Sequence, residues 1–328
     1  MKVAVIGIGA ISPSHINAIL ESGQEVVALC DVDVEKCQRA KVKFNIPNAA
    51  EYTDYKKMLD EVQLDSIHVC TPHYLHAEMI CEGLRRNINV LSEKPLAINF
   101  EQLAAVEKAV EQSKAQLGVC FQNRYNASVR YLKEFLKGKE VIAGSATLVW
   151  CRNAEYYASA AWRGTWDQEG GGVMINQAIH TLDLLQDCCG MPETVIGQCT
   201  NNALRNEIEV EDTAYGLFSL KNGGCFVINA TNASTVHFPI FSMFQTKTDT
   251  VVLCGDDVII NGEFLTKSDG KPLFGKDEWG VGHVKLIRDF YRCILSGEKF
   301  PLDFKEGEKA IRLVLKMYQS KGEKINVQ

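Results

Sequence analysis

Lys94 is the first residue whose type and position suggest chemistry. It follows a short apolar segment, residues 89–92, that is typical of a buried strand, and it stands in the sequence Glu93-Lys94-Pro95. A lysine at the carboxyl end of a strand lies at the ligand crevice of an open α/β sheet, where it can exchange a proton with a substrate hydroxyl. Position alone also fits an ordinary surface lysine.

His180 is the second candidate for proton transfer. It follows three consecutive glycines, residues 170–172, in a segment with helical apolar periodicity. Asn176 and His180 are four residues apart, so on an α-helix they share a face with Asp183. Asp183 could orient the His180 ring and Asn176 could hold a substrate hydroxyl. A hydrogen-bonded core histidine is the alternative. The apolar stripe expected on the opposite face consists of Ile175, Ile179 and Leu182.

A glycine-rich loop follows the first apolar segment. Residues 7–13 are GIGAISP, which is GxGxx followed by Ser12 where a third glycine is common. Gly7 permits a tight turn, and Gly9 lets the backbone approach a pyrophosphate at the N-terminus of the next helix. We expect Ser12 to cap that helix and Pro13 to be its first residue. An ordinary glycine-rich turn would explain the loop equally well by itself.

Asp31 gives this loop a specific meaning. It ends the second apolar segment, about 20 residues beyond the glycines, where a carboxylate accepts hydrogen bonds from the adenosine ribose. The same carboxylate would repel a ribose phosphate, and no arginine occurs in residues 32–34. The sequence therefore predicts NAD as the cofactor, in preference to NADP. The cationic ring of NAD⁺ would lower the pKa of a nearby Lys94.

The elements that must position these residues alternate in the first third of the chain. Apolar segments predict strands at residues 3–6, 26–30, 66–70, 89–92 and 116–120, with amphipathic helices between them. The predicted fold class is α/β, and it begins with a doubly wound (Rossmann) parallel sheet in an NAD-binding domain at residues 1–121.

The pattern changes after about Phe121. A helix is predicted at residues 126–136, and Asn222-Gly223 and Asn261-Gly262 are typical of hairpin turns between long alternating strands. A further helix is predicted at residues 304–319. We predict a C-terminal α+β domain at residues 122–328, with a large and mostly antiparallel sheet, for substrate binding and oligomerisation.

The predicted strand at residues 212–220 is apolar on both faces. Tyr215 and Leu217 alternate with Phe218 and Leu220. The helices of the domain can cover one face, so the other is expected to meet a second copy in a homo-oligomer, a dimer or a tetramer.

These motifs together resemble the glucose–fructose oxidoreductase and inositol dehydrogenase (Gfo/Idh/MocA) family over essentially the whole chain. The resemblance depends on the glycine loop, residues 71–76 (TPHYLH), Glu93-Lys94-Pro95 and the helix that contains His180. It implies that Lys94 and His180 are the catalytic residues and that a cis bond often precedes the matching proline. The cofactor-binding residues expected from the motifs and the resemblance are Gly7, Gly9, Ala10, Ile11, Asp31, Thr71, Pro72, His73, His76, Glu93, Lys94, Gln122, Trp162 and Arg163. The expected substrate-binding residues are Asn123, Arg124, Tyr157, Asn176 and Asp183.

Two of these assignments have open points. Many sugar dehydrogenases of the family have aspartate where this chain has Asn176, and an amide cannot act as a base or as a charged partner of His180. Asp183 is the carboxylate that the sequence offers instead. Tyr157 suits stacking on a carbohydrate, but aromatic core packing explains it equally well.

The resemblance implies an NAD-dependent oxidoreductase that acts on a hydroxyl-bearing carbon of a sugar, a polyol or a sugar derivative. Either His180 or Lys94 would take the hydroxyl proton. The alternatives are an NAD-recycling glycosidase or lyase of the same fold, and a non-catalytic NAD-sensing protein.

Composition disfavours several other classes. The net charge of -6 and the lack of a lysine- or arginine-rich block disfavour nucleic acid and membrane partners. Twelve cysteines without a CxxC pair are typical of reduced thiols in the cytoplasm. No metal site is predicted, because His15, His68, His73 and His76 show no ligand spacing with carboxylates.

Overall fold

The computed structural model describes residues 1–274 and 280–327, which form two compact units. The first unit comprises residues 1–125 and 270–307, and the second comprises residues 126–269 and 308–328. Residues 270–307 were expected in the second domain, but they belong to the first compact unit. The division at residue 121 therefore stays a prediction about domains, whereas each compact unit consists of two chain segments. None of the described helices is both long and apolar enough to cross a membrane.

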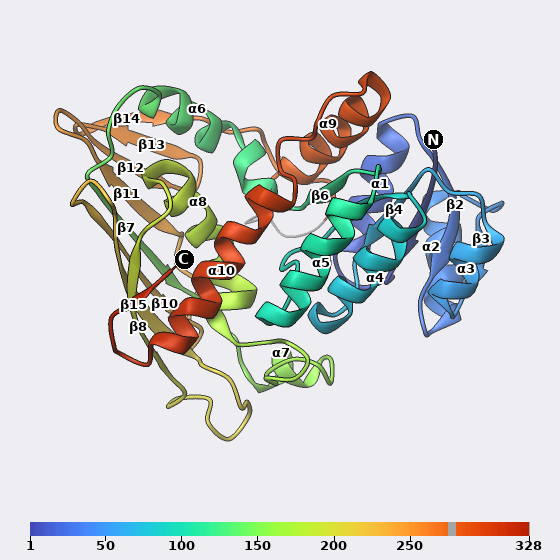
Figure 1. Cartoon of the computed structure of the whole chain (residues 1–328), viewed down its shortest axis with the longest axis horizontal. Helices are drawn as coiled ribbons and strands as arrows, with labels where there is room; N and C mark the ends of the chain where they lie inside the picture. The colour runs from blue at the N-terminus through green and yellow to red at the C-terminus, as the bar shows by residue number, and fades with distance from the viewer. Residues whose placement is uncertain (275–279, 328) are drawn as a thin grey trace. The chain divides into compact units, whose positions relative to one another are not determined.

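The first unit contains a six-stranded parallel sheet in the order β3-β2-β1-β4-β5-β6 (Figure 1). The order reverses between β1 and β4, which confirms the predicted doubly wound (Rossmann) topology. The prediction missed β3, a strand of only three residues that lacks a buried apolar run. The strands are β1 Lys2–Ile6, β2 Glu25–Cys30, β3 Ala50–Tyr52, β4 Ser66–Val69, β5 Asn89–Ser92 and β6 Leu117–Val119.

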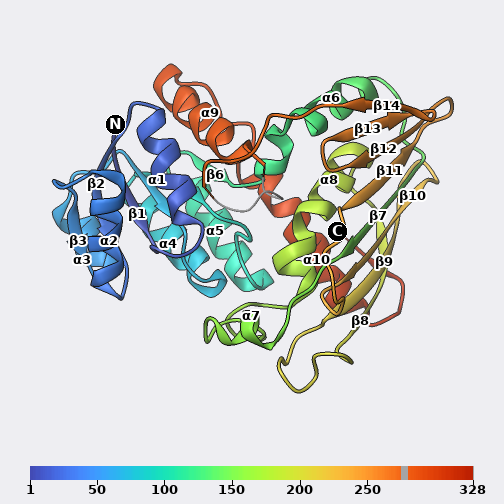
Figure 2. The ribbon, with the colours of Figure 1, turned by 180° about the vertical axis from the view of Figure 1, so that it is seen from behind.

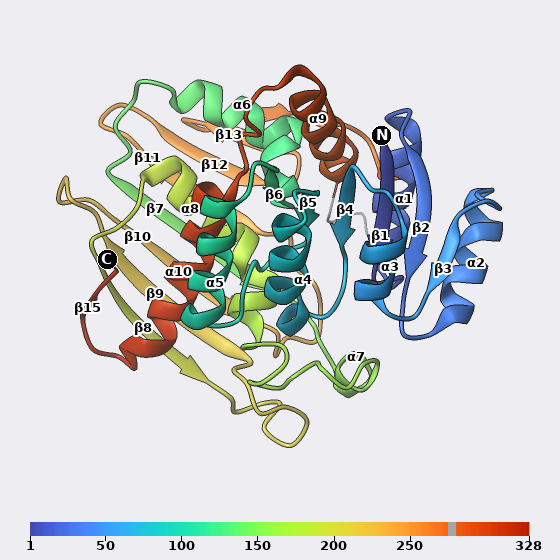
Figure 3. The same cartoon turned by 45° about the vertical axis from the view of Figure 1, so that its right-hand side comes forward.

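Helices connect these strands and cover both faces of the sheet (Figure 3). Right-handed crossovers place the helices after β1 and β4 on opposite faces, because the strand order runs in opposite directions from the switch point. Accordingly, α1 packs against α2 and α9, whereas α4 packs against α5. The helices are α1 Ser12–Glu21, α2 Val34–Phe44, α3 Tyr55–Glu61, α4 His73–Arg85, α5 Phe100–Gln112, the 3₁₀ turn η1 Gln122–Tyr125 and α9 Gly282–Ser296.

The second unit contains a nine-stranded sheet in the order β14-β13-β12-β11-β7-β10-β9-β8-β15. Its strand pairs are antiparallel except for the parallel pair of β10 with β7. Asn222-Gly223 and Asn261-Gly262 form the predicted hairpin turns, between β9 and β10 and between β13 and β14. The strands are β7 Ala143–Val149, β8 Thr194–Thr200, β9 Thr213–Ser219, β10 Cys225–Thr231, β11 Phe241–Gln245, β12 Thr250–Cys254, β13 Asp257–Ile260, β14 Glu263–Thr266 and β15 Ile325–Asn326.

The helices of the second unit lie on one face of this sheet (Figure 2). On the covered face the rings of Phe218 and Phe226 stack at 4.7 Å between centroids, and both are buried. Tyr215 and Leu217 lie on the other face and are exposed, so the strand is apolar on both faces as predicted. The helical elements are α6 Ala127–Leu136, α7 Ala154–Ala158, the π-helical turn η2 Met174–Ala178, α8 Ile179–Cys189 and, from residue 308 on, α10 Phe304–Ser320.

Candidate functional site

The glycine loop after β1 has the shape that a dinucleotide requires. Gly7 has φ +89°, and a Cβ there would lie 2.6 Å from the carbonyl oxygen of Cys70, so the loop packs tightly on the backbone after β4. A Cβ at Gly9 would meet no atom within 4 Å, which leaves room for the close approach of a pyrophosphate. Ala10 and Ile11 complete the turn into α1. The residues present therefore fit the predicted cofactor.

The predicted helix cap at Ser12 was wrong. Ser12 is already the first residue of α1, and Ile11 occupies the cap position without a side-chain hydrogen bond. The Ser12 hydroxyl instead donates to the carbonyl oxygen of Gly9 at 2.9 Å. The hydroxyl thus stabilises the glycine loop itself and caps none of the free N–H groups at the start of the helix.

Asp31 lies beside the glycine loop, where the ribose was expected. Its carboxylate accepts hydrogen bonds from the backbone N–H groups of Ile8 at 2.8 Å and Asp33 at 3.0 Å. The ammonium group of Lys36 lies 3.2 Å from the same carboxylate. The sequence prediction considered arginine in residues 32–34 only and therefore missed Lys36, which lies in the first turn of α2.

Two loops at the carboxyl ends of β4 and β5 are joined by His76. The Nδ1 atom of His76 lies 2.7 Å from the carbonyl oxygen of Pro95, and Nε2 lies 2.8 Å from that of Thr71. Burial lowers the pKa of His76. The peptide bond between Lys94 and Pro95 is cis. His73 begins α4 directly after Pro72, and its ring centroid lies 5.8 Å from that of His76. The residues from 71 to 76 and from 93 to 95 therefore form one connected edge of the sheet.

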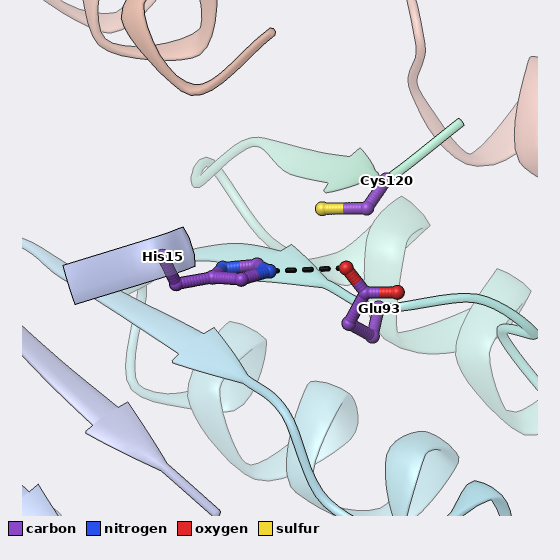
Figure 4. A group of neighbouring side chains, drawn as sticks. All are labelled: His15, Glu93 and Cys120. Carbon is purple, nitrogen blue, oxygen red and sulfur yellow. Dashed lines mark hydrogen bonds and ion pairs between the residues drawn. The ribbon is translucent and has the colours of Figure 1, made fainter. Parts of the chain in front are cut away.

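Glu93 is the centre of a buried polar network beside Lys94 in the chain. His15 Nε2 lies 3.0 Å from Glu93 Oε1 (Figure 4). His283 Nε2 lies 3.3 Å from the same oxygen. Burial acts to raise the pKa of Glu93, but the hydrogen bonds from His15 and His283 outweigh it and hold the pKa well below its usual value. Glu93 is therefore an anion next to the predicted catalytic lysine.

From His15 the network continues through His68 to Tyr291. His15 Nδ1 lies 2.8 Å from His68 Nδ1, and His68 Nε2 lies 2.7 Å from the hydroxyl of Tyr291. Burial lowers the pKa of His15 and that of His68. A neutral His15 that donates from Nε2 to Glu93 must accept at Nδ1, so His68 donates from Nδ1 and accepts at Nε2 from Tyr291. All three hydrogen bonds thus point toward Glu93.

Residue spacing along the chain showed no sign of a carboxylate near His15, but the fold brings Glu93 to it. Ligand atoms of His15, Glu93 and Cys120 lie within 4.8 Å of one another, and Figure 4 shows the Cys120 sulfur beside the hydrogen-bonded His15 and Glu93. Burial and the nearby Glu93 raise the pKa of the Cys120 thiol well above its usual value. The hydrogen bonds with His15 and His283 account for the position of the Glu93 carboxylate. We therefore assign His15, Glu93 and Cys120 to this buried network.

Residues 122–124 form part of η1 in the first unit. Gln122 is buried, whereas Asn123 and Arg124 are partly exposed. The Arg124 guanidinium lies 3.2 Å from the Glu306 carboxylate, and the neighbouring Tyr125 donates to Asp289 at 2.7 Å. The partner of Arg124 at residue 306 could not be found by local sequence reasoning, and the contact of Arg124 with substrate stays a prediction.

His180 lies on α8, directly after the π-helical turn η2. The sequence predicted a regular helix through this segment, but residues 174–178 form the wider turn, which is frequent at functional sites. Asn176 and His180 are both partly exposed. The predicted apolar stripe of Ile175, Ile179 and Leu182 is fully buried. Asp183 is also buried, and its carboxylate accepts from the Gln186 side chain at 3.1 Å.

A glutamate that sequence reasoning missed lies next to Asn176. The Asn176 amide nitrogen donates to Glu169 Oε1, and it lies 3.3 Å from the hydroxyl of Tyr156. Glu169 is 1% exposed, and burial raises its pKa to about 7. An acidic residue directly before three glycines was the available signal, but its burial is a tertiary property.

Tyr156 is the aromatic centre of the same polar group. The Arg163 guanidinium lies 4.4 Å from the Tyr156 ring and 4.6 Å from the Trp162 ring, and it donates to the Tyr156 hydroxyl at 2.5 Å. Tyr157 is 6% exposed and packs in a small core with Ile208 and Val210. Of the two explanations for Tyr157, core packing is therefore the one that its surroundings support.

Two protein-family models match this chain. A family model described as an oxidoreductase family with an NAD-binding Rossmann fold matches residues 1–121, and a GFO/IDH/MocA C-terminal domain model matches residues 129–257. An inositol 2-dehydrogenase/D-chiro-inositol 3-dehydrogenase of Lacticaseibacillus casei is 34% identical over 139 residues. That match covers 42% of this chain and 40% of the relative, so it spans less than half of either protein.

Other similar proteins match over the full length. An uncharacterised oxidoreductase of Bacillus subtilis, YrbE, is 23% identical over 96% of this chain and 93% of its own. The structure of the WlbA dehydrogenase from Bordetella pertussis, solved with NADH and UDP-GlcNAcA, superposes with a TM-score of 0.86 at 27% identity. It covers 99% of this chain and 98% of that protein.

Proposed function

Because the chain belongs to the GFO/IDH/MocA family of NAD-binding oxidoreductases, we propose that it transfers a hydride between nicotinamide and a hydroxyl-bearing carbon of a sugar, polyol or sugar derivative. The observation that supports this most directly is the position of Lys94 at the carboxyl end of β5. This is the edge of the sheet at which the loops after β1 and β4 pack together at Gly7. Ligands bind at this edge in doubly wound sheets.

The first unit supplies the cofactor site in this proposal. The backbone at Gly7 and Gly9, with Ala10 and Ile11 at the start of α1, would hold the pyrophosphate, and Asp31 would accept from the ribose hydroxyls. The bound NAD supplies the hydride acceptor. The remaining predicted cofactor contacts are proposed for Thr71, Pro72, His73, His76, Glu93, Lys94, Gln122, Trp162 and Arg163.

Proton transfer is assigned to Lys94 and His180. One of the two takes the hydroxyl proton as the carbon-bound hydrogen leaves, and general base catalysis of this kind contributes roughly 10²- to 10⁴-fold to a rate. Asn176 would hold a substrate hydroxyl. Asn123, Arg124, Tyr157 and Asp183 complete the proposed substrate set, among which Tyr157 has the weakest support because it is a core residue.

The names of similar proteins guide the choice of substrates. WlbA was solved with UDP-GlcNAcA, and two relatives that match less than half of the chain are inositol dehydrogenases. A panel should therefore contain inositols, free aldoses and nucleotide-linked sugars with and without a carboxylate.

The test is NADH formation across this panel by the wild-type protein and by Lys94→Met and His180→Asn variants. A substrate should give NADH with the wild-type protein, and each variant should lose roughly 10²-fold or more of kcat. His180→Asn should retain its affinity for NAD. Wild-type turnover in both variants would contradict the assignment. Release of free sugar without net NADH would favour the recycling glycosidase or lyase, and NAD binding without any turnover would favour a sensor.

We also propose that the protein is a cytoplasmic homo-oligomer that prefers NAD to NADP. All twelve cysteines are free thiols, which supports a reducing compartment. Asp31 supports NAD, and the exposed apolar face of the nine-stranded sheet supports self-association.

A further inference from the structure

Glu169 and Asn176 form a pair for which the proposed mechanism so far gives no joint role. The two oxygens of the Glu169 carboxyl group accept from different donors, Oε2 from the backbone N–H of Gly164 at 2.5 Å and Oε1 from the Asn176 amide. The second donor position of the Asn176 amide nitrogen faces the Tyr156 hydroxyl at 3.3 Å. Both N–H groups of the amide are therefore directed into the protein.

This arrangement fixes the orientation of the Asn176 side chain. A primary amide has two N–H donors on nitrogen and one acceptor, its carbonyl oxygen. With the nitrogen held by Glu169 and Tyr156, the amide can meet a substrate hydroxyl only through Oδ1, as an acceptor. A substrate hydroxyl bound in this way would donate a hydrogen bond to Oδ1, so it is a different hydroxyl from the one whose proton goes to Lys94 or His180.

The surroundings of Glu169 explain why its carboxyl group titrates near neutrality. Burial raises its pKa to about 7, whereas the hydrogen bonds from Gly164 and Asn176 and the charge of Arg163 act to lower it, and Glu211 acts to raise it. The titratable and charged groups around Glu169 include Tyr156 and Tyr157 of α7, Arg163, Glu211 and Tyr318 of α10.

We propose that Glu169 is a positioning residue, whose carboxylate holds Asn176 as a hydrogen-bond acceptor for a substrate hydroxyl other than the one that loses its proton to Lys94 or His180. The inference rests on the proposed function. It also assigns the anionic form of Glu169 to the active state, because the hydroxyl oxygen of a protonated carboxyl group is a poor acceptor for an amide N–H. Substrate binding should therefore weaken as the pH falls through about 7.

Exchanging the carboxyl and amide groups between positions 169 and 176 tests the proposal. In Glu169→Gln the new amide accepts from Gly164 but presents N–H to Asn176, so the Asn176 amide must rotate and offer a donor to the substrate. In the double variant Glu169→Gln/Asn176→Asp, the glutamine still accepts from Gly164. Its N–H group now donates to the carboxylate that replaces the Asn176 amide, and this carboxylate again offers the substrate an acceptor. The single variant Asn176→Asp places two carboxyl groups in contact and raises the pKa of the pair.

On an identified substrate, Glu169→Gln should raise KM about 10-fold with a smaller change in kcat, the magnitude of one misdirected hydrogen bond. The dependence of KM on pH near 7 should become weaker with it, whereas the dependence of kcat on the general base should remain. The double variant should recover most of the KM. Glu209→Gln, which removes an exposed carboxylate from the same region, is the matched control and should leave KM and the pH profile unchanged.

A second measurement does not depend on turnover. The side-chain amide signals of Asn176, followed by nuclear magnetic resonance, should shift with a midpoint near pH 7 in the wild-type protein and stay constant in Glu169→Gln. Absence of this shift, or wild-type KM and pH profile in Glu169→Gln, would overturn the inference. If no substrate gave NADH, the proposed function would fail, while the amide signals would still decide whether Glu169 controls Asn176.

Discussion

Gly7 and Gly9 differ in what a side chain at each position would meet. An alanine at Gly7 would adopt a φ of +89° and place its Cβ against the backbone of Cys70, whereas an alanine at Gly9 would point into open space. The first substitution therefore strains the folded chain, and the second obstructs only the surface that a pyrophosphate would approach.

We predict that Gly7→Ala lowers the free energy of unfolding by about 2 kcal/mol or more, because strain and collision add. Gly9→Ala should keep the melting temperature of the wild-type protein and weaken NAD binding by about 10-fold or more. Calorimetric melting and titration with NAD separate the two effects. Equal melting temperatures for both variants would show that the packing at Gly7 is not as tight as the structure indicates.

Asp31 and Lys36 together determine the charge that a ribose or a ribose phosphate would meet. Asp31→Ser should reduce the ratio of NAD affinity to NADP affinity by about 10-fold, because it removes a hydrogen-bond acceptor and leaves the Lys36 ammonium without its carboxylate. In Lys36→Ala the ratio should change in the opposite direction. Dissociation constants for both cofactors measure the ratio, and an unchanged ratio in Asp31→Ser would contradict the assignment of Asp31.

At the scale of elements, the buried network joins four parts of the first unit. His15 belongs to α1, His68 to β4 and Tyr291 to α9, and Glu93 directly follows β5. Because His15 and His68 have a lowered pKa in the folded protein, the unfolded chain binds more protons than the folded one below about pH 6.5. Their contribution to stability is therefore lost as the pH falls below this value. The lowered pKa of Glu93 extends the same loss to lower pH.

Hydrogen exchange should detect this loss locally. We predict that the amides of β4 and α9 lose protection as the pH falls from about 7 to about 5, after correction for the intrinsic exchange rate. Tyr291→Phe should lower protection by about 1 kcal/mol at neutral pH, since it removes the donor that fixes the His68 tautomer. Constant protection across this range would show that the histidines are not held in the neutral form.

The second unit should respond to pH in the opposite direction. The raised pKa of Glu169 means that the folded protein holds a proton which the unfolded chain releases between about pH 4.5 and 7. Its contribution to stability is therefore lost as the pH rises through this range. The protection of amides in η2 and α8 should fall accordingly, and this slope should be smaller in Glu169→Gln. Part of the slope should remain, because burial also raises the pKa of Glu211. An unchanged slope in the variant would assign it to another group.

At the scale of the whole molecule, the outer face of the nine-stranded sheet bears a stripe of apolar side chains. Leu217 of β9 lies opposite Val227 of β10 and Ile196 of β8, and all three side chains are exposed. Exposed apolar patches of this kind are typical of protein interfaces.

We predict that Leu217→Asp converts an oligomer into a monomer, because the interface would bury an unpaired charge. Light scattering coupled to size-exclusion chromatography measures the mass. Val42→Asp, which changes an isolated exposed valine of α2, is the control and should leave the mass unchanged. A monomeric wild-type protein would contradict the proposed oligomer.

The sequence by itself determined the fold class, the position of the glycine loop and the placement of Lys94 at a strand end. These are local properties, since apolar periodicity and turn chemistry depend on residues a few positions apart. The tertiary structure alone decided which distant residues meet. The contact of His15 with Glu93, the return of residues 270–307 to the first unit and the burial of Glu169 against Asn176 have no local signal. They arise when packing brings separate segments together, and burial then changes the pKa of the groups that meet.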